Sequence, residues 1–124
     1  MIATAERGRG GGVSQVDCSR QGEVLAHELG VISVFGGNAR LVSSVGSVLD
    51  RTARAASGFG AIAAVLGIAG GFMLRRNNFQ EPDPALGGID PVPNVARAAR
   101  LDVVQNNGLA FGGNNAIAVL GRVA

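Results

Sequence analysis

The sequence contains no lysine, tryptophan or tyrosine, and only one cysteine and one histidine among its 124 residues. A single cysteine, Cys18, excludes an internal disulfide and a zinc site built from several cysteines. An unpaired thiol is typical of a reducing compartment, so we expect a cytoplasmic protein. The sole histidine, His27, has no second histidine or cysteine at ligand spacing, and we expect no metal and no cofactor.

Aromatic residues are also scarce, at 4% of the chain, and they do not alternate with basic residues. All eleven basic residues are arginines scattered along the chain, and the formal net charge is only +2. A nucleic-acid surface normally needs a basic stripe or an aromatic stacking platform. The composition therefore argues against a nucleic-acid partner.

The chain is instead rich in apolar residues, at 47%, and in glycine, with 20 copies. This composition excludes disorder of the whole chain and predicts at most one domain with a modest core of small residues. Residues 1–12 lack the apolar core of a signal peptide, and we expect them to be a flexible N-terminal segment. Residues 13–124 are the expected folded domain.

Hydrophobic patterns and turn residues predict an α/β domain with the element order β-α-β-α-loop-β-β. Asp50 is the predicted N-cap of the second helix, and Gly70-Gly71 is its predicted end. The predicted strands are residues 13–17, 41–45, 101–104 and 116–119, the predicted helices are 23–31 and 52–68, and the long loop is 77–93.

The stretch from Ala55 to Leu74 carries no charged residue and permits two interpretations. Its length fits a membrane span, and its glycines would suit packing between membrane helices. However, arginines flank both ends and give no orientation signal. A helix buried within an α/β domain is equally apolar, and we prefer that interpretation.

A glycine-rich turn near the C-terminus is the most informative motif. Residues 107–120 read NGLAFGGNNAIAVL, with Gly112-Gly113 between a short apolar run and an alternating one. Glycine permits a close approach to the backbone, which is typical of a loop beside a binding site. Two further motifs precede it, GFMLRRNNFQEPDP at residues 71–84 and VPNVAR at residues 92–97.

These motifs resemble, in order and spacing, three segments of the β-ketoacyl synthases, the condensing enzymes of fatty acid and polyketide synthesis. They are the family's Gly-Phe-Gly-Gly-Thr-Asn loop, its segment ending in Pro-Asp-Pro, and its Val-Pro-Asn-x-Ala-Arg motif. The resemblance covers roughly residues 13–123 and corresponds to most of the C-terminal half of a condensing enzyme. It implies a partial thiolase-like α/β fold.

The resemblance also implies that the catalytic groups are missing. In this family a cysteine carries the acyl chain, two histidines assist decarboxylation, and a lysine orders the site. Here the lysine position holds Gly46, one histidine position holds Arg51, and the other aligns with Ser19. The nucleophilic cysteine lies in the half of the family fold that this sequence does not match. The likeness is to a 3-oxoacyl-ACP synthase, an acyltransferase, but we expect no independent catalysis.

Substrate contacts are implied for the glycine-rich turn. The resemblance places Phe111, Gly112, Gly113 and Asn114 beside the acyl pocket, with Phe111 as its gate. The alternative is a tight turn that serves only the fold. Similarly, Arg75-Arg76 is interpreted as the solvated end of the apolar helix, with contact to an acidic acyl-carrier protein as the alternative.

Three functions follow from these observations. The first is a degenerate, non-catalytic subunit that pairs with a full-length ketosynthase, as chain-length factors do, or with itself; a gene product without present activity is an open variant. The second is an acyltransferase half-site completed by a partner synthase. The third is a small membrane protein that spans at residues 55–74. In the first two, the apolar helix should be partly uncovered and mark an interface.

Overall fold

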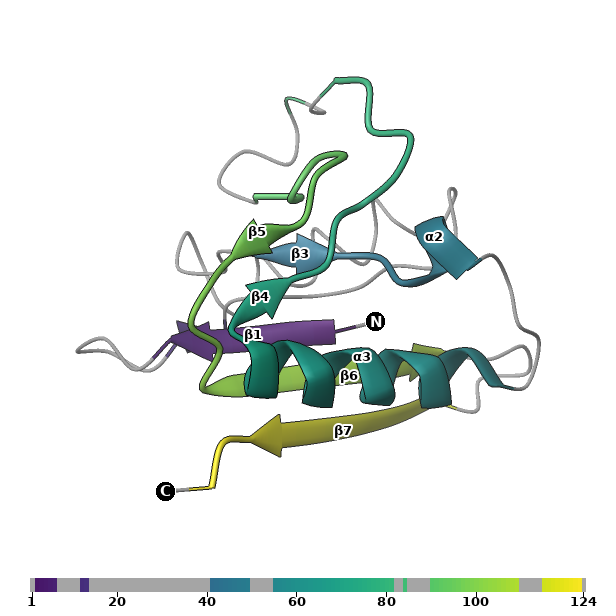
Figure 1. Cartoon of the computed structure of the whole chain (residues 1–124). Helices are drawn as coiled ribbons and strands as arrows, with labels where there is room; N and C mark the ends of the chain where they lie inside the picture. Colours follow the sequence, from purple (N-terminus) through teal and green to yellow (C-terminus); the bar gives the residue numbers. More distant parts are fainter. Residues whose placement is uncertain are drawn as a thin grey trace.

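The computed structural model describes residues 2–6, 12–13, 41–49, 55–81, 84, 90–109 and 115–123. Within these residues, an antiparallel sheet is covered on one face by the helix α3 (Figure 1). The strands run in the order β2-β1-β6-β7, and β3 also pairs with β1. Their bounds are β1 Ile2–Glu6, β2 Gly12–Val13, β3 Val42–Ser43, β6 Val103–Leu109 and β7 Asn115–Gly121.

Strand β1 lies within residues 1–12, the segment that the sequence analysis expects to be flexible. Ile2–Glu6 is hydrogen-bonded to β6 along one edge, with Ile2 opposite Asn106 and Ala5 opposite Val103. On its other edge it pairs with β3 and β2. A strand this short has no periodic signal of its own in the sequence. Its partners far along the chain supply the pairing that keeps it extended. The domain boundary at residue 13 stays a prediction.

The predicted terminal strand pair is confirmed, and both strands are longer than predicted. Strands β6 and β7 form an antiparallel hairpin whose register runs from Val103 opposite Gly121 to Leu109 opposite Asn115. The extension of β6 beyond residue 104 reads QNNGL, and its asparagines and glycine are poor strand formers on their own. Pairing on both sides of β6, with β1 and β7, holds this polar segment extended.

Helix α3 spans Ala56–Gly70, somewhat later than predicted. Its N-cap is Ala55, which makes no side-chain capping bond, so the prediction of Asp50 as N-cap is wrong. The predicted end is confirmed, because Gly71 adopts the left-handed conformation (φ 66°) and its N–H donates to the Gly67 carbonyl at 2.9 Å. A residue with a side chain would be strained at that angle.

The interpretation of residues 55–74 as a membrane span does not match this helix. The helix has 15 residues, and strand β4 (Phe72–Met73) follows directly after Gly71. In the described part of the chain, no helix is both long and apolar enough to cross a membrane.

Two features, one on each side of α3 in the chain, were not predicted. Strand β4 pairs with β5 (Arg97–Ala98) in a small second sheet, and a short helix α2 spans Gly46–Leu49. The predicted loop at 77–93 has neither helix nor strand in its described residues, apart from single bridges to its neighbours. The predicted helix at 23–31 and residues 14–17 of the first predicted strand lie outside the described residues.

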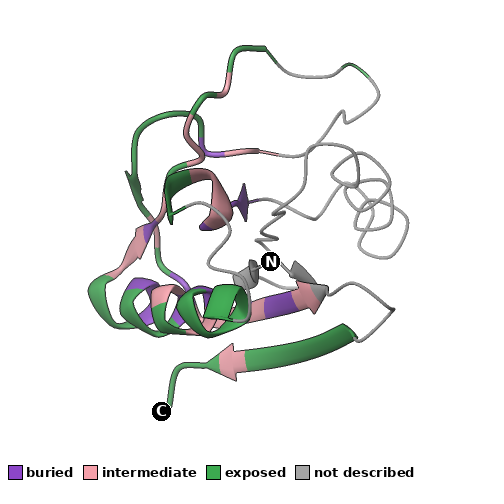
Figure 2. Ribbon diagram, turned by 90° about the vertical axis from the view of Figure 1, so that its right-hand side faces the viewer, coloured by how far each residue is buried: buried purple, intermediate pink, exposed green. Residues whose placement is uncertain are grey.

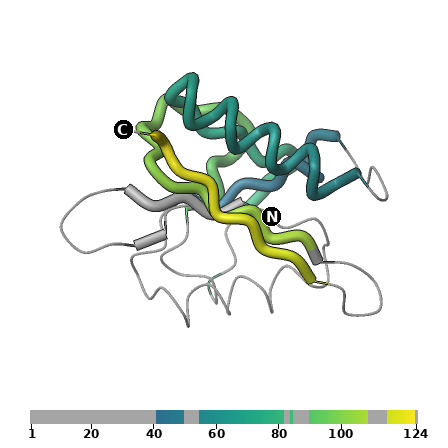
Figure 3. The backbone as a smooth tube through the Cα atoms, turned by 90° about the horizontal axis from the view of Figure 1, so that it is seen from below, coloured from purple at the N-terminus to yellow at the C-terminus, as the bar shows by residue number. Residues whose placement is uncertain are grey.

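The hydrophobic core lies between α3 and the sheet and extends toward the segment after residue 90 (Figure 2). Seen from below, α3 runs along one side of the β6–β7 hairpin (Figure 3). The predicted buried strand at 41–45 is confirmed as buried throughout, although only Val42–Ser43 is regular strand. The buried core residues are Leu41, Val45, Ala64, Ile68, Met73, Val92, Leu101 and Val104.

Candidate functional site

Gly46, which the sequence resemblance aligns with the family's lysine, is the one of the three predicted catalytic-position residues that the structure describes. It is the first residue of α2, directly after the buried pair Ser44 and Val45, and is itself half-buried. Because glycine has no side chain, this position offers neither a cation nor a side-chain hydrogen-bond donor.

Hydroxyl and amide groups organise the turn at Gly46. The Ser47 hydroxyl donates to the Ser44 carbonyl at 2.6 Å, and the Ser47 amide also donates to that carbonyl, at 3.1 Å. The Asn77 backbone N–H donates to the Ser47 hydroxyl oxygen at 3.0 Å. This last bond links α2 to the segment after β4, 30 residues along the chain. The turn is thus held in shape by uncharged groups.

The other predicted site residues lie outside the described residues. These are Ser19, Arg51 and the four positions of the glycine-rich turn, Phe111, Gly112, Gly113 and Asn114. Cys18 and His27 are outside as well. The hairpin nevertheless fixes where the turn begins and ends, because Leu109 and Asn115 are paired.

The hairpin end of β6 packs closely on the start of α3, a contact that the sequence analysis missed. The Asn106 amide nitrogen donates to the Ser57 carbonyl at 2.8 Å. A Cβ at Gly60 would lie 2.6 Å from the Asn106 carboxamide oxygen, and one at Gly108 would lie 3.0 Å from the Ser57 Cβ. A side chain at either glycine would force Asn106 or Ser57 to shift. These two crossings place the first turns of α3 beside the strand that leads into the glycine-rich turn.

The opposite face of β6 carries a second polar pair. The Gln105 side-chain amide donates to the Asn107 carboxamide oxygen at 2.6 Å, and Asn107 is buried. Residues two apart on a strand share a face, so this pair points away from the face that Asn106 presents to α3. Ser43 on β3 is also buried, and its hydroxyl has no hydrogen-bond partner within the described part of the chain.

The Val-Pro-Asn motif connects two loop segments through hydrogen bonds. Asn94 adopts a left-handed backbone conformation (φ 55°), which asparagine tolerates better than most residues. Its carboxamide accepts from the Phe79 N–H at 3.1 Å and donates to the Phe79 carbonyl at 2.8 Å. Arg76 forms backbone bonds with Val92 and Asn94 beside it. The motif therefore holds the segment that ends in the Pro-Asp-Pro sequence.

Val92, at the start of that motif, is strained. It has φ 48° although it is β-branched, and only 1% of it is exposed. Its N–H donates to an Asp90 carboxylate oxygen at 3.0 Å, and the other carboxylate oxygen accepts from Arg97 at 2.5 Å. The Asp90 carbonyl accepts from Val42 of β3 at 2.8 Å. Burial and this set of bonds hold the unfavourable conformation in place.

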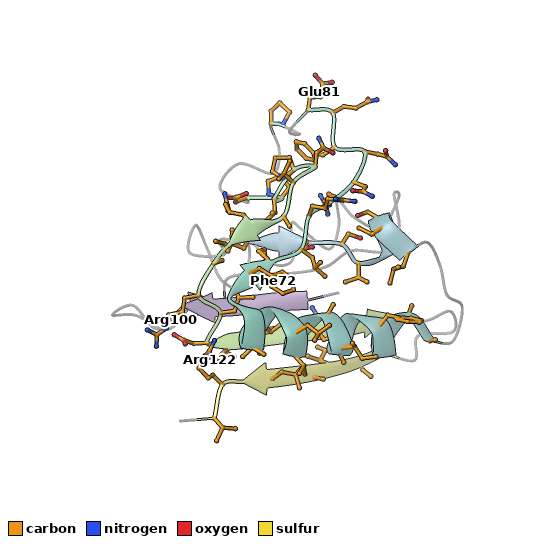
Figure 4. All side chains as sticks on the ribbon, in the orientation of Figure 1. Phe72, Glu81, Arg100 and Arg122 are labelled. Atoms are coloured by element: carbon orange, nitrogen blue, oxygen red, sulfur yellow. The ribbon has the colours of Figure 1, made fainter. Side chains whose placement is uncertain are left out.

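A second set of charges lies at the C-terminal end of α3 (Figure 4). Asp102 accepts from Arg100 at 3.2 Å and lies 3.9 Å from Arg122. Arg122 also donates to the Ile68 carbonyl in the last turn of the helix. A cation at this end complements the helix dipole. The described residues contain no group of three or more histidine, cysteine, aspartate or glutamate side chains that could hold a metal.

Arg75 and Arg76 do not end the helix as predicted. Helix α3 stops at Gly70, and β4 separates it from both arginines. Arg75 is exposed and donates to the Asn77 carboxamide oxygen at 2.6 Å. Its guanidinium is therefore on the surface, where a partner could reach it.

The outer face of α3 is apolar and uncovered. Its four largest side chains are exposed, in contrast to Gly60, Ala64, Gly67 and Ile68, which face the sheet. The exposed side chains are Phe59, Ile62, Val65 and Leu66. The sequence-based expectation of a partly uncovered apolar helix is thus confirmed. We call these four residues the α3 face.

Comparison with known proteins finds ketoacyl synthases, although no family model matches the chain. The ketoacyl synthase alpha subunit of the tetracenomycin polyketide synthase from Streptomyces glaucescens is 40% identical over 81 residues, which are 65% of this chain and 19% of that protein. Nodulation protein E from Rhizobium sp. (strain N33) is 37% identical over 92 residues, 73% of this chain and 23% of the relative. The chain therefore spans about a fifth to a quarter of the length of these curated relatives.

Solved structures agree with this result. The ishigamide ketosynthase/chain length factor matches with a TM-score of 0.82 and 33% identity over 90% of this chain and 28% of the matched one. A β-ketoacyl synthase from Burkholderia phymatum STM815 matches with a TM-score of 0.74 and 26% identity over the same shares. The predicted resemblance to β-ketoacyl synthases and the predicted partial thiolase-like α/β fold are confirmed.

Proposed function

We propose that this chain, which resembles part of a β-ketoacyl synthase in sequence and fold, is a non-catalytic subunit of the chain-length-factor kind in fatty acid or polyketide biosynthesis. The observation that carries the proposal is Gly46 at the lysine position. No lysine occurs anywhere in the sequence to replace it, and the sole histidine, His27, lies outside both histidine motifs. Decarboxylative condensation needs positioned charged groups that stabilise the developing enolate. A segment that lacks these charged groups can have a structural role in the complex but not a catalytic one.

The contacts around Gly46 support a structural role for this segment. Ser44, Ser47 and Asn77 close the turn through uncharged hydrogen bonds. The motifs farther along, at Asp90 and Asn94, make internal bonds. These interactions stabilise the shape of the fold and leave proton transfer to a partner.

The proposed partner is a full-length ketosynthase, with a second copy of this chain as the other possibility. The α3 face supports association, because exposed apolar patches on soluble domains mark interaction sites. We further propose that the exposed Arg75 contributes to contact with an acidic acyl-carrier protein. A cytoplasmic location is proposed with this function, in keeping with the single cysteine.

The test is co-expression of the chain with a full-length ketosynthase from a type II fatty acid or polyketide system. We expect the two proteins to co-purify at a fixed ratio, and we expect the length of the condensation product to change when the chain is present. The chain alone should not transfer acyl groups from an acyl-carrier protein. Acyl transfer by the chain alone would overturn the proposal, as would the lack of both a complex and an effect on the product.

An acyltransferase half-site completed by the partner is the second candidate. The closely packed β6–α3 contact favours it, since Asn106 and Gly108 fix the strand that leads into Phe111. In that case Phe111→Ala in the complex should change the rate of acyl transfer to the partner's nucleophile. In a purely structural subunit, the same variant should leave that rate unchanged.

A further inference from the structure

The polar end of strand β6 carries the one Asn-Gly pair in the sequence, Asn107-Gly108. An asparagine followed by glycine is chemically labile, because the next backbone nitrogen can attack the side-chain carboxamide and glycine has no Cβ to hinder the attack. The same pair is common in the turns of β-hairpins. Here it lies within a seven-residue strand instead, opposite Ile117 and Ala116 of β7.

The packing of α3 on the sheet accounts for the glycine of this pair. A Cβ at Gly108 would lie 3.0 Å from the Ser57 Cβ, in the first turn of the helix. A larger residue would therefore force Ser57 to shift. The close contact between helix and strand favours glycine directly after Asn107, and the labile pair is a consequence of that contact.

The folded strand keeps the two reacting groups apart. Side chains stand roughly perpendicular to a sheet, whereas the next backbone nitrogen lies along the strand. Asn107 is 5% exposed, and its carboxamide oxygen accepts from the Gln105 side chain at 2.6 Å. A ring between the Asn107 side chain and the Gly108 nitrogen requires the backbone to leave the extended conformation, which disrupts the pairing with β7. The strand must therefore open before the ring can close.

We propose that Asn107 is a deamidation site that the folded strand protects, so that the residue is converted only while β6 is open. The Gly108 nitrogen attacks the Asn107 Cγ, the Cγ–Nδ2 bond breaks, and ammonia leaves with the proton from the Gly108 nitrogen. Water then opens the cyclic imide. Its addition at the Cγ carbonyl gives aspartate, and its addition at the backbone carbonyl gives isoaspartate. Water is the only co-reactant, and the inference is independent of the proposed function.

Both products disfavour the native strand. Aspartate places an ionised carboxylate at a buried position, which is costly. Isoaspartate inserts an additional carbon into the backbone, which shifts Gly108 and Leu109 out of register with β7. Deamidation should therefore mark irreversibly the molecules that have spent time unfolded, and these molecules should refold less well than the unmodified chain.

The experiment compares the rate of deamidation at Asn107 in native buffer and in guanidinium chloride, at the same slightly alkaline pH. Trypsin cleaves after arginine, so Asn107 is recovered in the peptide 101–122, and mass spectrometry of its fragments identifies the modified residue. We expect deamidation to be at least tenfold slower in the native chain than in the denatured chain. Asn78 and Asn94 precede phenylalanine and valine, and as internal controls they should react slowly in both states.

Gly108→Ala is the matched variant, measured in guanidinium chloride, where its effect on packing does not matter. The added methyl group hinders ring closure and should slow deamidation at Asn107 at least tenfold. After the denaturant is removed, chains modified at Asn107 should be depleted from the fraction that elutes as the native protein on a sizing column. Equal rates in the native and denatured chains overturn the proposal, as does a denatured chain in which Asn107 reacts no faster than Asn78. Refolding of the modified chains with the same yield as the unmodified chain overturns it too.

Discussion

At the scale of single residues, the glycines and asparagines define the packing of the helix on the sheet. Gly60 admits the Asn106 side chain, which in turn reaches the Ser57 carbonyl. Asn94 adopts a backbone angle that few residues tolerate and binds both backbone groups of Phe79. These positions explain why a chain with so much glycine and so few aromatics still has a specific fold.

Gly60 and Gly58 form a matched pair in the same helix. Gly60→Ala should destabilise the fold by about 1–3 kcal/mol, because the new Cβ meets the Asn106 carboxamide and overpacks the crossing. Gly58→Ala has nothing within 4 Å and should stabilise the helix by about 0.5–1 kcal/mol. Urea denaturation measures both. Equal effects at the two positions would contradict the role of Asn106.

Asn94→Ala tests the hydrogen bonds between Asn94 and the Phe79 backbone. It removes two hydrogen bonds to Phe79 and places alanine at φ 55°, so we expect a loss of about 1–2 kcal/mol. Asn94→Gly relieves the backbone strain but lacks the carboxamide, and should lose less. Denaturation curves distinguish the two effects. If the free energy of unfolding is unchanged in both variants, the hydrogen bonds between Asn94 and Phe79 contribute nothing to stability.

At the scale of secondary-structure elements, the two ends of α3 are fixed in different ways. No side chain caps the start, where the Asn106 carboxamide binds the Ser57 carbonyl from the neighbouring strand. The end combines a left-handed glycine with a guanidinium from the residue after β7. The sequence predicted the glycine, because that signal is local. It could not predict the Arg122 contact, which spans 54 residues.

The contact of Arg122 with the helix end predicts a salt-dependent contribution to stability. Arg122→Met keeps most of the apolar stem but removes the charge and the bond to Ile68, and should cost about 0.5–1.5 kcal/mol at low salt. Arg100→Met is the control, since that side chain is 80% exposed and its ion pair contributes little. Thermal unfolding at two salt concentrations compares them. A larger loss for Arg100→Met would contradict this assignment.

At the scale of the whole molecule, the architecture is a sheet with one face covered by a helix whose own outer face is uncovered. A membrane span and a protein interface are both compatible with an uncharged helix in the sequence. The structure distinguishes the helix face that contacts the sheet from the face that does not. The second face supports the proposed association with a ketosynthase.

The α3 face predicts variants that separate binding from folding. Ile62→Glu and Leu66→Glu replace exposed side chains and should change stability by at most about 0.5 kcal/mol. Each should reduce co-purification with a full-length ketosynthase at least tenfold, because a buried unpaired carboxylate is costly. Pull-down and denaturation are measured on the same preparations. Binding that survives both changes would assign the interface to another surface.

The sequence alone determined the family likeness, the α/β class, the end of α3 at Gly71 and the terminal strand pair, because motifs, glycine conformation and hydrophobic pattern act locally. That Gly46 and Arg51 stand at the family's lysine and histidine positions remains a prediction from the sequence resemblance. Only the tertiary structure decided that Ile2–Glu6 is a central strand, that α3 starts at Ala56 without a side-chain cap, and that Asn106 fits against Gly60. These features depend on partners far apart in the chain, and no local pattern encodes such contacts.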